Sequence, residues 1–552
     1  MKIKLIKGPH EIITEVDAES GITAEELAGR YQSGLPYKVL AVTIDNKLED
    51  LSYVIDRPCA VELLDMRSRA AKLIYENSLV MIYLKAIEET VGRVQVDVPN
   101  SLGKTLYTEI RTKEPLTDEM LGRIEKRMHE IVDADIPFEK ETADREHAFE
   151  MLEKADLHEK KRMLEHAPDV RQVKYYSLDG FTNFFYGVMV PSSGYIDKFA
   201  LQKYRRGVLL RYPRSADPSR LPDFEDEKKL YAAFGENKKW EKILGVSYVT
   251  DLNEKIGAGQ EKTIIQLSEA LHEKRIVEIA DEILKKNRRL VLIAGPSSSG
   301  KTTFAKRLCI QLAVAGTYPL YMGTDDYFLE REQTPLDENG EKDYESFESL
   351  DTELFNDHMN RLIRGETVDL PTFDFLEGRK KYGRKTALKS GAPIVIEGIH
   401  ALNVRLTAQV EDSKKYKIYI SPLTQLAIDC HNRVPITDAR LIRRIVRDNK
   451  YRGHSAADTI KSWNKVRDGE EKNIFPYTGE ADVFFNSAHA YELCVLKQFA
   501  YPLLAEIPRS DEAYSEAVRL MRFLDFFKVI DADLIANDSL LREFIGGSIF
   551  VD

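Results

Sequence analysis

The chain has 552 residues, which is too long for one hydrophobic core and predicts three or more domains. Hydrophobic residues (43%) and charged residues (31%) occur at the levels of soluble globular proteins, and no apolar run is long enough to span a bilayer. The net charge of -11 argues against broad non-specific nucleic-acid binding, and the four cysteines form no CxxC pair, which fits a reducing cytoplasm.

Residues 1–64 predict a small α+β module. Alternating strands, a capped helix and two further apolar strands follow one another in this order: Lys2–Lys7, Glu11–Val16, Thr23–Gln32, Val39–Ile44 and Cys59–Leu64. Gly8-Pro9 would form the turn between the first two strands. The layout resembles the TGS domain, a ubiquitin-like module at the start of threonyl-tRNA synthetases; an unrelated β-grasp module is the alternative.

Residues 65–235 continue this resemblance. A helix is expected at Arg67–Glu88, and the segments 94–104 and 183–194 resemble pieces of the second synthetase domain, which hydrolyses mischarged tRNA. That family carries H-x-x-x-H early and a Cys with a His late. Here the four positions hold residues unable to do metal or acid–base work: Arg67, Ala71, Phe185 and Met189. We predict a retained fold without editing chemistry, left with RNA sensing, dimerisation or packing.

A basic cluster lies in the same region, at Lys203, Arg205, Arg206, Arg211 and Arg214. It is either a solvated charged face or a contact for tRNA or another RNA. We also expect a homo-oligomer. Residues 236–288 then form a helical connector, broken at Gly257-Ala-Gly259 and continued by one amphipathic helix at Thr263–Lys286.

Residues 289–487 alternate short apolar strands with helices, which predicts an α/β fold of the P-loop type, with a parallel sheet and helices on both faces. The strands are expected at Leu290–Ala294, Leu320–Gly323, Pro393–Ile396, Tyr416–Ser421 and Asp482–Asn486. Ligands should gather at their carboxyl ends. Residues 488–552 would form a C-terminal helical extension.

The first of these strands runs into Gly295–Thr302, which fits G-x-x-x-x-G-K-[ST]. The glycines let backbone N–H groups converge on a polyphosphate, the following helix adds its positive end, and Lys301 can reach the β- and γ-phosphates. Thr302 can bind Mg²⁺ through its hydroxyl. We predict ATP binding by the main chain and side chains of Gly295, Ser297, Ser298, Ser299, Gly300, Lys301, Thr302 and Thr303; a plain Gly/Ser turn is the alternative.

Three polar elements follow the later strands. Asp325 stands first after the second strand and is the candidate to accept a hydroxyl proton; Glu397 follows the third and can hold Mg²⁺. The alternative for both is capping of a turn or helix. The segment 436–454 is expected to form a mobile lid whose arginines face transferring phosphates, or else a solvated charged helix: Arg440, Arg443, Arg444, Arg447 and Arg452.

Aromatic residues stand beside carboxylates in a helix expected at Asp343–Asp351 and in the segment Leu370–Arg379. They could stack a base and hold ribose hydroxyls, or serve as core and cap. These two alternatives remain open.

Together the motifs GPSSSGKTT, DDYF, LPTFDF, IEGIHAL and the arginine-rich segment resemble the uridine kinase branch of the phosphoribulokinase/uridine kinase family. The resemblance implies ATP·Mg²⁺-dependent transfer to the 5′-hydroxyl of a nucleoside. Asp325 would be the catalytic base, acting with Lys301, and Glu397 would hold the metal with Thr302. Arg444, Arg447 and Arg452 would contact substrate and phosphates, and Tyr344 would flank the base.

Four positions depart from that family. Glu345 replaces an aspartate that grips the ribose, Phe373 a tyrosine, Gly378 a base-contacting histidine, and His454 an arginine. The phosphate machinery is complete, whereas the base-reading positions differ. The substrate site would hold Tyr344, Glu345, Phe373 and Arg444. Two other functions stay open: a kinase for another small hydroxylated metabolite, and a nucleotide-gated switch controlling RNA binding by the N-terminal half.

Overall fold

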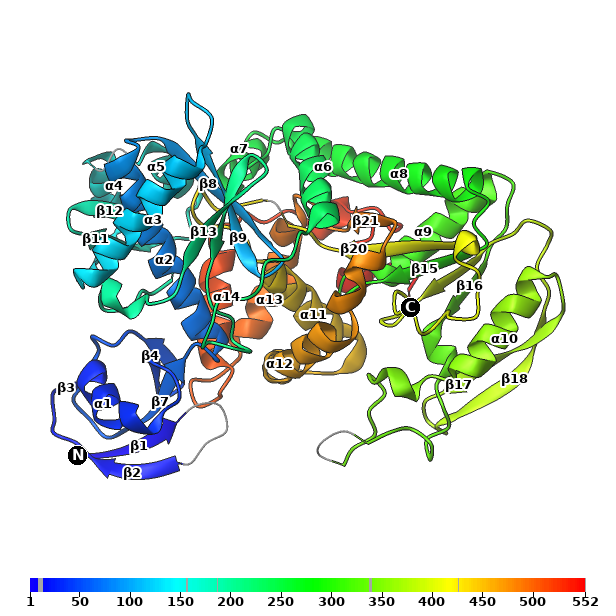
Figure 1. The fold of residues 1–552 in the computed structure, drawn as a ribbon, viewed down its shortest axis with the longest axis horizontal. Helices are drawn as coiled ribbons and strands as arrows, with labels where there is room; N and C mark the ends of the chain where they lie inside the picture. Colours follow the sequence, from blue (N-terminus) through cyan, green and yellow to red (C-terminus); the bar gives the residue numbers. More distant parts are fainter. Residues whose placement is uncertain (8–12, 155–156, 186, 337–339, 425, 552) are drawn as a thin grey trace.

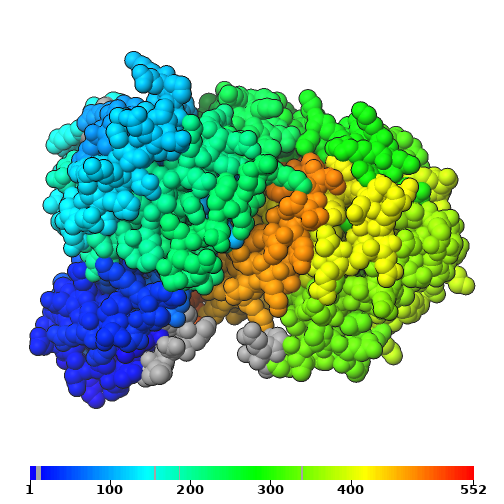
Figure 2. All heavy atoms as spheres, viewed as in Figure 1, coloured from blue at the N-terminus to red at the C-terminus, as the bar shows by residue number. Residues whose placement is uncertain are grey.

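The long helix α8 (Glu261–Lys285) connects two halves of the molecule (Figure 1). The computed structural model describes residues 1–7, 13–154, 157–185, 187–336, 340–424 and 426–551. Figure 2 shows the N-terminal module at one end of the molecule and residues of the P-loop half at the other. In the described part of the chain, no helix combines the length and the apolar character needed to cross a bilayer.

The N-terminal module is a five-stranded sheet of order β2-β1-β7-β4-β5 with one helix. Its elements are β1 (Lys2–Lys7), β2 (Ile13–Asp17), β3 (Ile22–Thr23), α1 (Ala24–Tyr31), β4 (Val39–Ile44), β5 (Lys47–Glu49), β6 (Val54–Ile55) and β7 (Cys59–Asp65). Thr23 caps α1, as the sequence predicts, and the structure adds a reciprocal capping box between Thr23 and Glu26. The antiparallel pair β1–β2 is confirmed, while Gly8-Pro9 lies outside the described residues.

The second unit packs two antiparallel sheets, β13-β14-β9-β8 and β10-β11-β12, around the buried helix α2. Its elements are α2 (Arg69–Thr90), β8 (Gln95–Leu102), β9 (Thr105–Arg111), α3 (Asp118–Asp133), β10 (Glu139–Asp144), α4 (Arg145–Lys154), α5 (His158–His166), β11 (Gln172–Leu178), β12 (Phe181–Phe184), β13 (Ala200–Tyr204) and β14 (Gly207–Arg211). The α+β character that the sequence predicts is confirmed.

The connector has three helices, α6 (Lys228–Leu244), α7 (Val249–Gly257) and α8. The predicted break after Gly257 is present, and Gly259 adopts a φ of +72° that other residues rarely take. The boundary expected at 236 falls inside α6, because that helix already begins at Lys228.

The P-loop half is built on a five-stranded parallel sheet of order β16-β19-β15-β20-β21. The strands are β15 (Leu290–Ala294), β16 (Leu320–Gly323), β19 (Ile394–Glu397), β20 (Lys415–Ser421) and β21 (Val483–Asn486). Along β15, Val291 and Ile293 join one buried cluster with α8 and α9 (Lys301–Val314), while Leu290 and Leu292 join another with α10 (Thr352–Ile363). Helices therefore cover both faces, as predicted.

The remaining elements of this half are β17 (Val368–Asp374), β18 (Arg379–Thr386), α11 (Ile436–Arg452) and α12 (Ala456–Asn473). The helix expected at Asp343–Asp351 is wrong. Only a short 3₁₀ turn forms there, at Phe347–Ser349, and Asp351 is instead the N-cap of α10, accepting the Leu354 N–H at 3.1 Å. Asp351 ends the motif and caps the next helix, α10, so the motif itself is not helical.

The C-terminal extension consists of α13 (Glu492–Ala505), α14 (Tyr514–Leu524) and α15 (Arg542–Ile545). Helix α14 joins the two halves, because Ser515 accepts the Leu48 N–H at 2.6 Å from the N-terminal module. Asp438 of α11 is fully buried and forms ion pairs with Arg69 of α2 and, at 2.6 Å, with Arg519 of α14. One buried carboxylate thus ties together three segments that are distant in sequence.

We predict that Asp438→Ala destabilises the protein by about 3 kcal/mol, because it leaves two partly buried guanidinium groups, those of Arg69 and Arg519, with Glu516 as their one shared carboxylate. Differential scanning calorimetry measures the effect. Glu15→Ala is the control, since it breaks a solvent-exposed pair with Lys2 and should change stability little. Equal melting temperatures for Asp438→Ala and the wild type would contradict the role given to this carboxylate.

Candidate active site

The loop between β15 and α9 lies so close to its neighbours that two of its positions exclude a side chain. A Cβ at residue 295 would lie 2.1 Å from the Ile420 carbonyl oxygen of β20. A Cβ at residue 300 would lie 2.5 Å from a methyl group of Leu540, and Gly300 also has a φ of +84°. Both glycines of the motif are therefore required by the fold, and the loop curls with its N–H groups free to converge.

The polar groups of this loop have partners that show where an anion fits. The ammonium of Lys301 donates to the carbonyl oxygens of Gly295 at 3.0 Å and Pro296 at 3.4 Å. The Ser297 N–H donates to Glu470 at 2.9 Å, and the Thr303 N–H donates to Glu543 at 3.2 Å. Two carboxylates thus accept from donors at the two ends of the loop. We call this loop and the first turn of α9, residues 295–303, the phosphate cradle.

Thr302 and Glu397 meet beside this cradle. The Thr302 hydroxyl donates to Glu397 Oε1 at 2.8 Å, and the Tyr321 hydroxyl donates to the same oxygen at 2.7 Å. A hydroxyl and a carboxylate are the oxygen ligands that Mg²⁺ prefers, so the donor set fits the metal that the sequence implies. Tyr321 was not predicted; it stands within a short apolar strand and carries no motif, so only the three-dimensional contact shows its role.

Asp325 lies in a 3₁₀ turn, Thr324–Tyr327, directly after β16. A Cβ at residue 398 would lie 1.8 Å from the Thr324 hydroxyl oxygen, so Gly398 lets this turn pack against the end of β19. Burial of the carboxyl and the nearby charge of Glu397 raise the pKa of Asp325, while Lys301 lowers it. Asp325 as a whole residue is nevertheless exposed to solvent, so an acceptor can reach it.

The arginines of α11 divide into two groups. Arg440 and Arg443 are 1% and 0% exposed and brace the cradle from behind, donating to the carbonyl oxygens of Ser297 at 3.0 Å and Ser298 at 3.3 Å. Each is neutralised by a buried glutamate, Arg440 by Glu470 and Arg443 by Glu492. These two are structural residues rather than phosphate ligands.

Arg444, Arg447 and Arg452 instead surround Asp448, at 3.1, 2.7 and 3.6 Å. Arg444 also donates to the Ser297 hydroxyl at 2.7 Å, so at least one of these cations touches the cradle. Burial lowers the pKa of Arg444, and Asp448 opposes that effect. Asp448 was not predicted, although it lies four residues from both Arg444 and Arg452, the spacing at which oppositely charged residues meet on a helix.

The expected mobile lid differs from what the structure shows. Helix α11 buries Ala439, Leu441, Ile442 and Ile445 completely, and it packs among α12, α13 and α15. The sequence predicts a mobile lid from the arginines alone, whereas the apolar residues that alternate with them bury the helix in the core.

The acceptor side carries aromatic rings. Phe328 contacts both Tyr344 and Phe373 edge to face, with ring centroids 5.5 and 5.6 Å apart. Phe373 is only 6% exposed, which favours a packing role for it. The Glu345 carbonyl accepts from His400 and Asn473, both at 3.0 Å, and a Cβ at residue 469 would lie 2.5 Å from its carboxylate. At Gly378, where the resembled family has a histidine, the side chain of Arg331 fills the space.

The four positions of the lost editing motif do not form a polar site. Arg67 pairs with Asp65 at 2.8 Å, whereas Ala71, Phe185 and Met189 are buried among apolar residues. Two of the five residues of the basic cluster form ion pairs, Arg206 with Glu109 at 3.0 Å and Arg214 with Glu471 at 3.7 Å. Lys203 and Arg205 are exposed, so an RNA contact and a solvated charged face both remain predictions.

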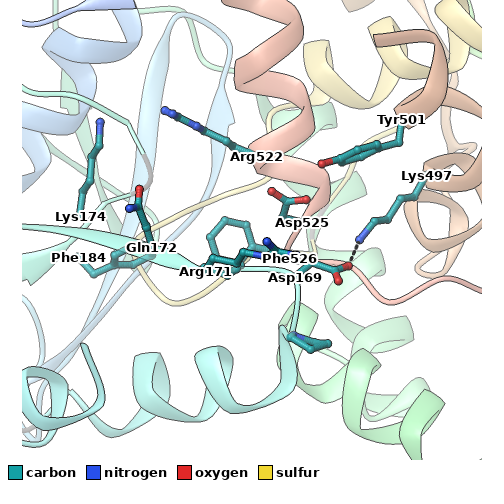
Figure 3. A pocket seen from close by; sticks show the side chains of 12 residues that line it. Asp169, Arg171, Gln172, Lys174, Phe184, Lys497, Tyr501, Arg522, Asp525 and Phe526 are labelled. Carbon is teal, nitrogen blue, oxygen red and sulfur yellow. Dashed lines mark hydrogen bonds and ion pairs between the residues drawn. The ribbon is translucent and has the colours of Figure 1, made fainter. Parts of the chain in front are cut away.

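A cavity of about 710 Å³ lies away from the cradle, between β11 and the helices α13 and α14 (Figure 3). None of the predicted site residues lines it. Across its wall, Lys497 forms an ion pair with Asp169 at 2.7 Å, as the dashed line in the figure shows.

Comparison with known proteins gives separate matches for the two halves. Residues 290–493 match the model of the Phosphoribulokinase / Uridine kinase family. The N-terminal half is similar to threonine–tRNA ligases: 26% identical over 180 residues to that of Clostridium kluyveri and 30% over 182 residues to that of Azoarcus sp., in each case 33% of this chain. This chain spans only 28% of the length of these relatives.

Two solved structures are similar to the P-loop half. A possible uridine kinase from Bacillus stearothermophilus is 23% identical, with 38% of this chain and 97% of that chain covered and a TM-score of 0.26. Phosphoribulokinase from Rhodobacter spheroides is 14% identical, with 36% and 70% covered and a TM-score of 0.23. On the family match, residues 290–493 form a domain of the phosphoribulokinase/uridine kinase family, behind an N-terminal half similar to threonine–tRNA ligases.

Proposed function

We propose that this protein is an ATP-dependent kinase that transfers the γ-phosphoryl group to the 5′-hydroxyl of a nucleoside. The observation that carries the proposal is the juxtaposition of Lys301, Glu397 and Asp325 at the carboxyl ends of neighbouring parallel strands, where ligands of such sheets bind. A phosphate clamp alone would suit a nucleotide switch. A proton acceptor with a raised pKa beside the clamp suits transfer to an alcohol.

In this proposal the cradle amides and the Lys301 ammonium hold the triphosphate, and Thr302 and Glu397 hold Mg²⁺. The metal supplies charge neutralisation on the phosphate oxygens. Asp325 accepts the proton of the acceptor hydroxyl, whose oxygen forms the new bond to the γ-phosphorus while the bond to the β–γ bridging oxygen breaks. Arg444, adjacent to the cradle, offsets negative charge on the group in transfer.

The nucleoside acceptor is inferred from the family match and from the ring-lined side of the site. Tyr344 and Glu345 would contact the base and the ribose. Arg331, which fills the space over Gly378, is a hydrogen-bond donor near the position of a base-reading histidine in the resembled family. A kinase for another small alcohol remains the second candidate, since the substituted base-reading positions leave the phosphate machinery intact. The release of ADP with uridine, cytidine, adenosine, guanosine and inosine decides between the two.

We predict that Asp325→Asn lowers kcat by about 10²–10⁴-fold with every acceptor, because the amide cannot accept the hydroxyl proton. Coupled ADP-release assays measure the turnover, and calorimetry with Mg·ADP checks that nucleotide binding is retained. Asp326→Asn, at the next residue of the same turn, is the matched control and should lose far less. Wild-type turnover in Asp325→Asn would reject the assignment.

The raised pKa of Asp325 also predicts a pH dependence. Only the deprotonated carboxylate accepts a proton, so kcat/KM should fall as the pH is lowered through that pKa. The acid limb should therefore lie above the value of about 3.9 for an ordinary aspartate. A pH profile of kcat/KM tests this, and the residual activity of Asp325→Asn should lack the limb. A limb at or below the ordinary value would contradict the environment described for this carboxylate.

Gly398→Ala should lower kcat by at least about tenfold, because its methyl group displaces Thr324 and with it the turn that carries Asp325. The affinity for ADP without Mg²⁺ should change little, since residues 295–303 are not displaced. Gly479→Ala is the control, because a Cβ there meets no atom within 4 Å. If both variants keep full turnover, close packing of this turn does not position the base.

A further inference from the structure

The end of the chain folds over the phosphate cradle. Leu540 packs directly against Gly300, and the ammonium of Lys450 on α11 donates to the Ile545 carbonyl at 2.9 Å. Lys306 of α9 donates to the Phe550 carbonyl. The segment closes on itself, since the Ile549 N–H donates to the Asn537 carbonyl at 3.1 Å. Figure 1 shows the chain ending beside α9 and β15. We call residues 537–550 the tail.

Burial holds the backbone of the tail in place. Four of its apolar side chains are at most 2% exposed and join the core cluster that contains the apolar face of α9: Leu540, Leu541, Phe544 and Ile545. The Phe544 ring also stacks on the buried guanidinium of Arg443, 4.8 Å from the ring centre. Release of the whole tail would expose all of this surface, so movement near the cradle is confined to single side chains.

Glu543 is the acidic residue on the buried part of the tail, and it reaches into the cradle. Its Oε2 accepts from the Thr303 hydroxyl at 2.8 Å and from the Thr303 N–H at 3.2 Å. Thr303 lies in the first turn of α9, whose N–H groups have no acceptor within the helix. Such N–H groups are the donors that bind phosphate at the start of a P-loop helix.

We propose that Glu543 is an internal competitor for the nucleotide's phosphates: the tail supplies an anion to the cradle, and nucleotide binding requires the Glu543 side chain to leave Thr303. This inference rests on the proposed function only in so far as the cradle binds a nucleotide; it does not depend on the acceptor. A carboxylate and a phosphate oxygen cannot both take the Thr303 N–H, and their like charges repel at this distance. The tail backbone stays packed while the side chain turns away.

Isothermal titration calorimetry on the full chain tests the proposal with two probes, Mg·ADP and inorganic tripolyphosphate. Glu543→Ala should bind both about tenfold more tightly than the wild type, because no charged hydrogen-bonded group has to be displaced. Glu543→Gln, which keeps the shape and loses the charge, should gain less. Asp538→Asn removes an exposed acid from the same tail and should stay within about twofold of the wild type.

The outcomes separate this proposal from its alternatives. Unchanged or weaker binding by both Glu543→Ala and Glu543→Gln would overturn it, because Glu543 would then support the cradle rather than compete for it. A gain for Mg·ADP without a gain for tripolyphosphate would also overturn it, since the competition is placed at the phosphates. Thermal unfolding without ligand checks that the variants are folded, and Glu543→Gln serves if Glu543→Ala is not. Tighter binding together with no phosphorylation of any nucleoside would reject the proposed acceptor and leave this inference standing.

Discussion

The backbone N–H groups in the first turn of α9 have no carbonyl acceptor within the helix, and the other groups of the site are arranged around these unpaired donors. Such donors point in one direction and carry the positive end of the helix dipole, so they require an anion. In the structure, carboxylates of Glu470 and Glu543 accept from the loop and from this turn. Phosphate oxygens satisfy the same donors in our proposal. Carboxylate oxygens and phosphate oxygens can therefore accept hydrogen bonds from the same N–H groups of the cradle.

Two buried arginines of α11 make the cradle rigid. Buried Arg440 and Arg443 hold the carbonyl oxygens of Ser297 and Ser298, and their own charges are balanced by Glu470 and Glu492. Removing one partner of a buried pair leaves an uncompensated charge, which makes such a brace hard to deform. The brace belongs to α11, which is itself tied by Asp438 to α2 and α14. Contacts between the N-terminal half and the P-loop half therefore reach the helix that holds the loop.

The parts of the fold and of the site that depend on a few neighbouring residues could be predicted from the sequence. The helix cap at Thr23, the parallel strands and the loop at Gly295–Thr302 each follow from a few adjacent residues, and the structure has them. The position of Asp325 after β16 follows from strand order. The roles of Tyr321 and Glu543 do not, because each depends on a contact with a residue distant in sequence. The arginine pattern of 436–454 is the same for a mobile lid and for a packed helix in which Arg440 and Arg443 face buried glutamates, so the sequence alone did not distinguish the two.

The most direct test of the account is a crystal structure of the full chain with Mg²⁺ and a non-hydrolysable ATP analogue. The account predicts a phosphate on the Thr303 N–H, the Glu543 carboxylate withdrawn from it, Glu470 still paired with Arg440, and Asp325 facing the terminal phosphate with room for an acceptor hydroxyl. An analogue bound elsewhere, for example in the cavity of Figure 3, with Glu543 still on the Thr303 N–H, would contradict it.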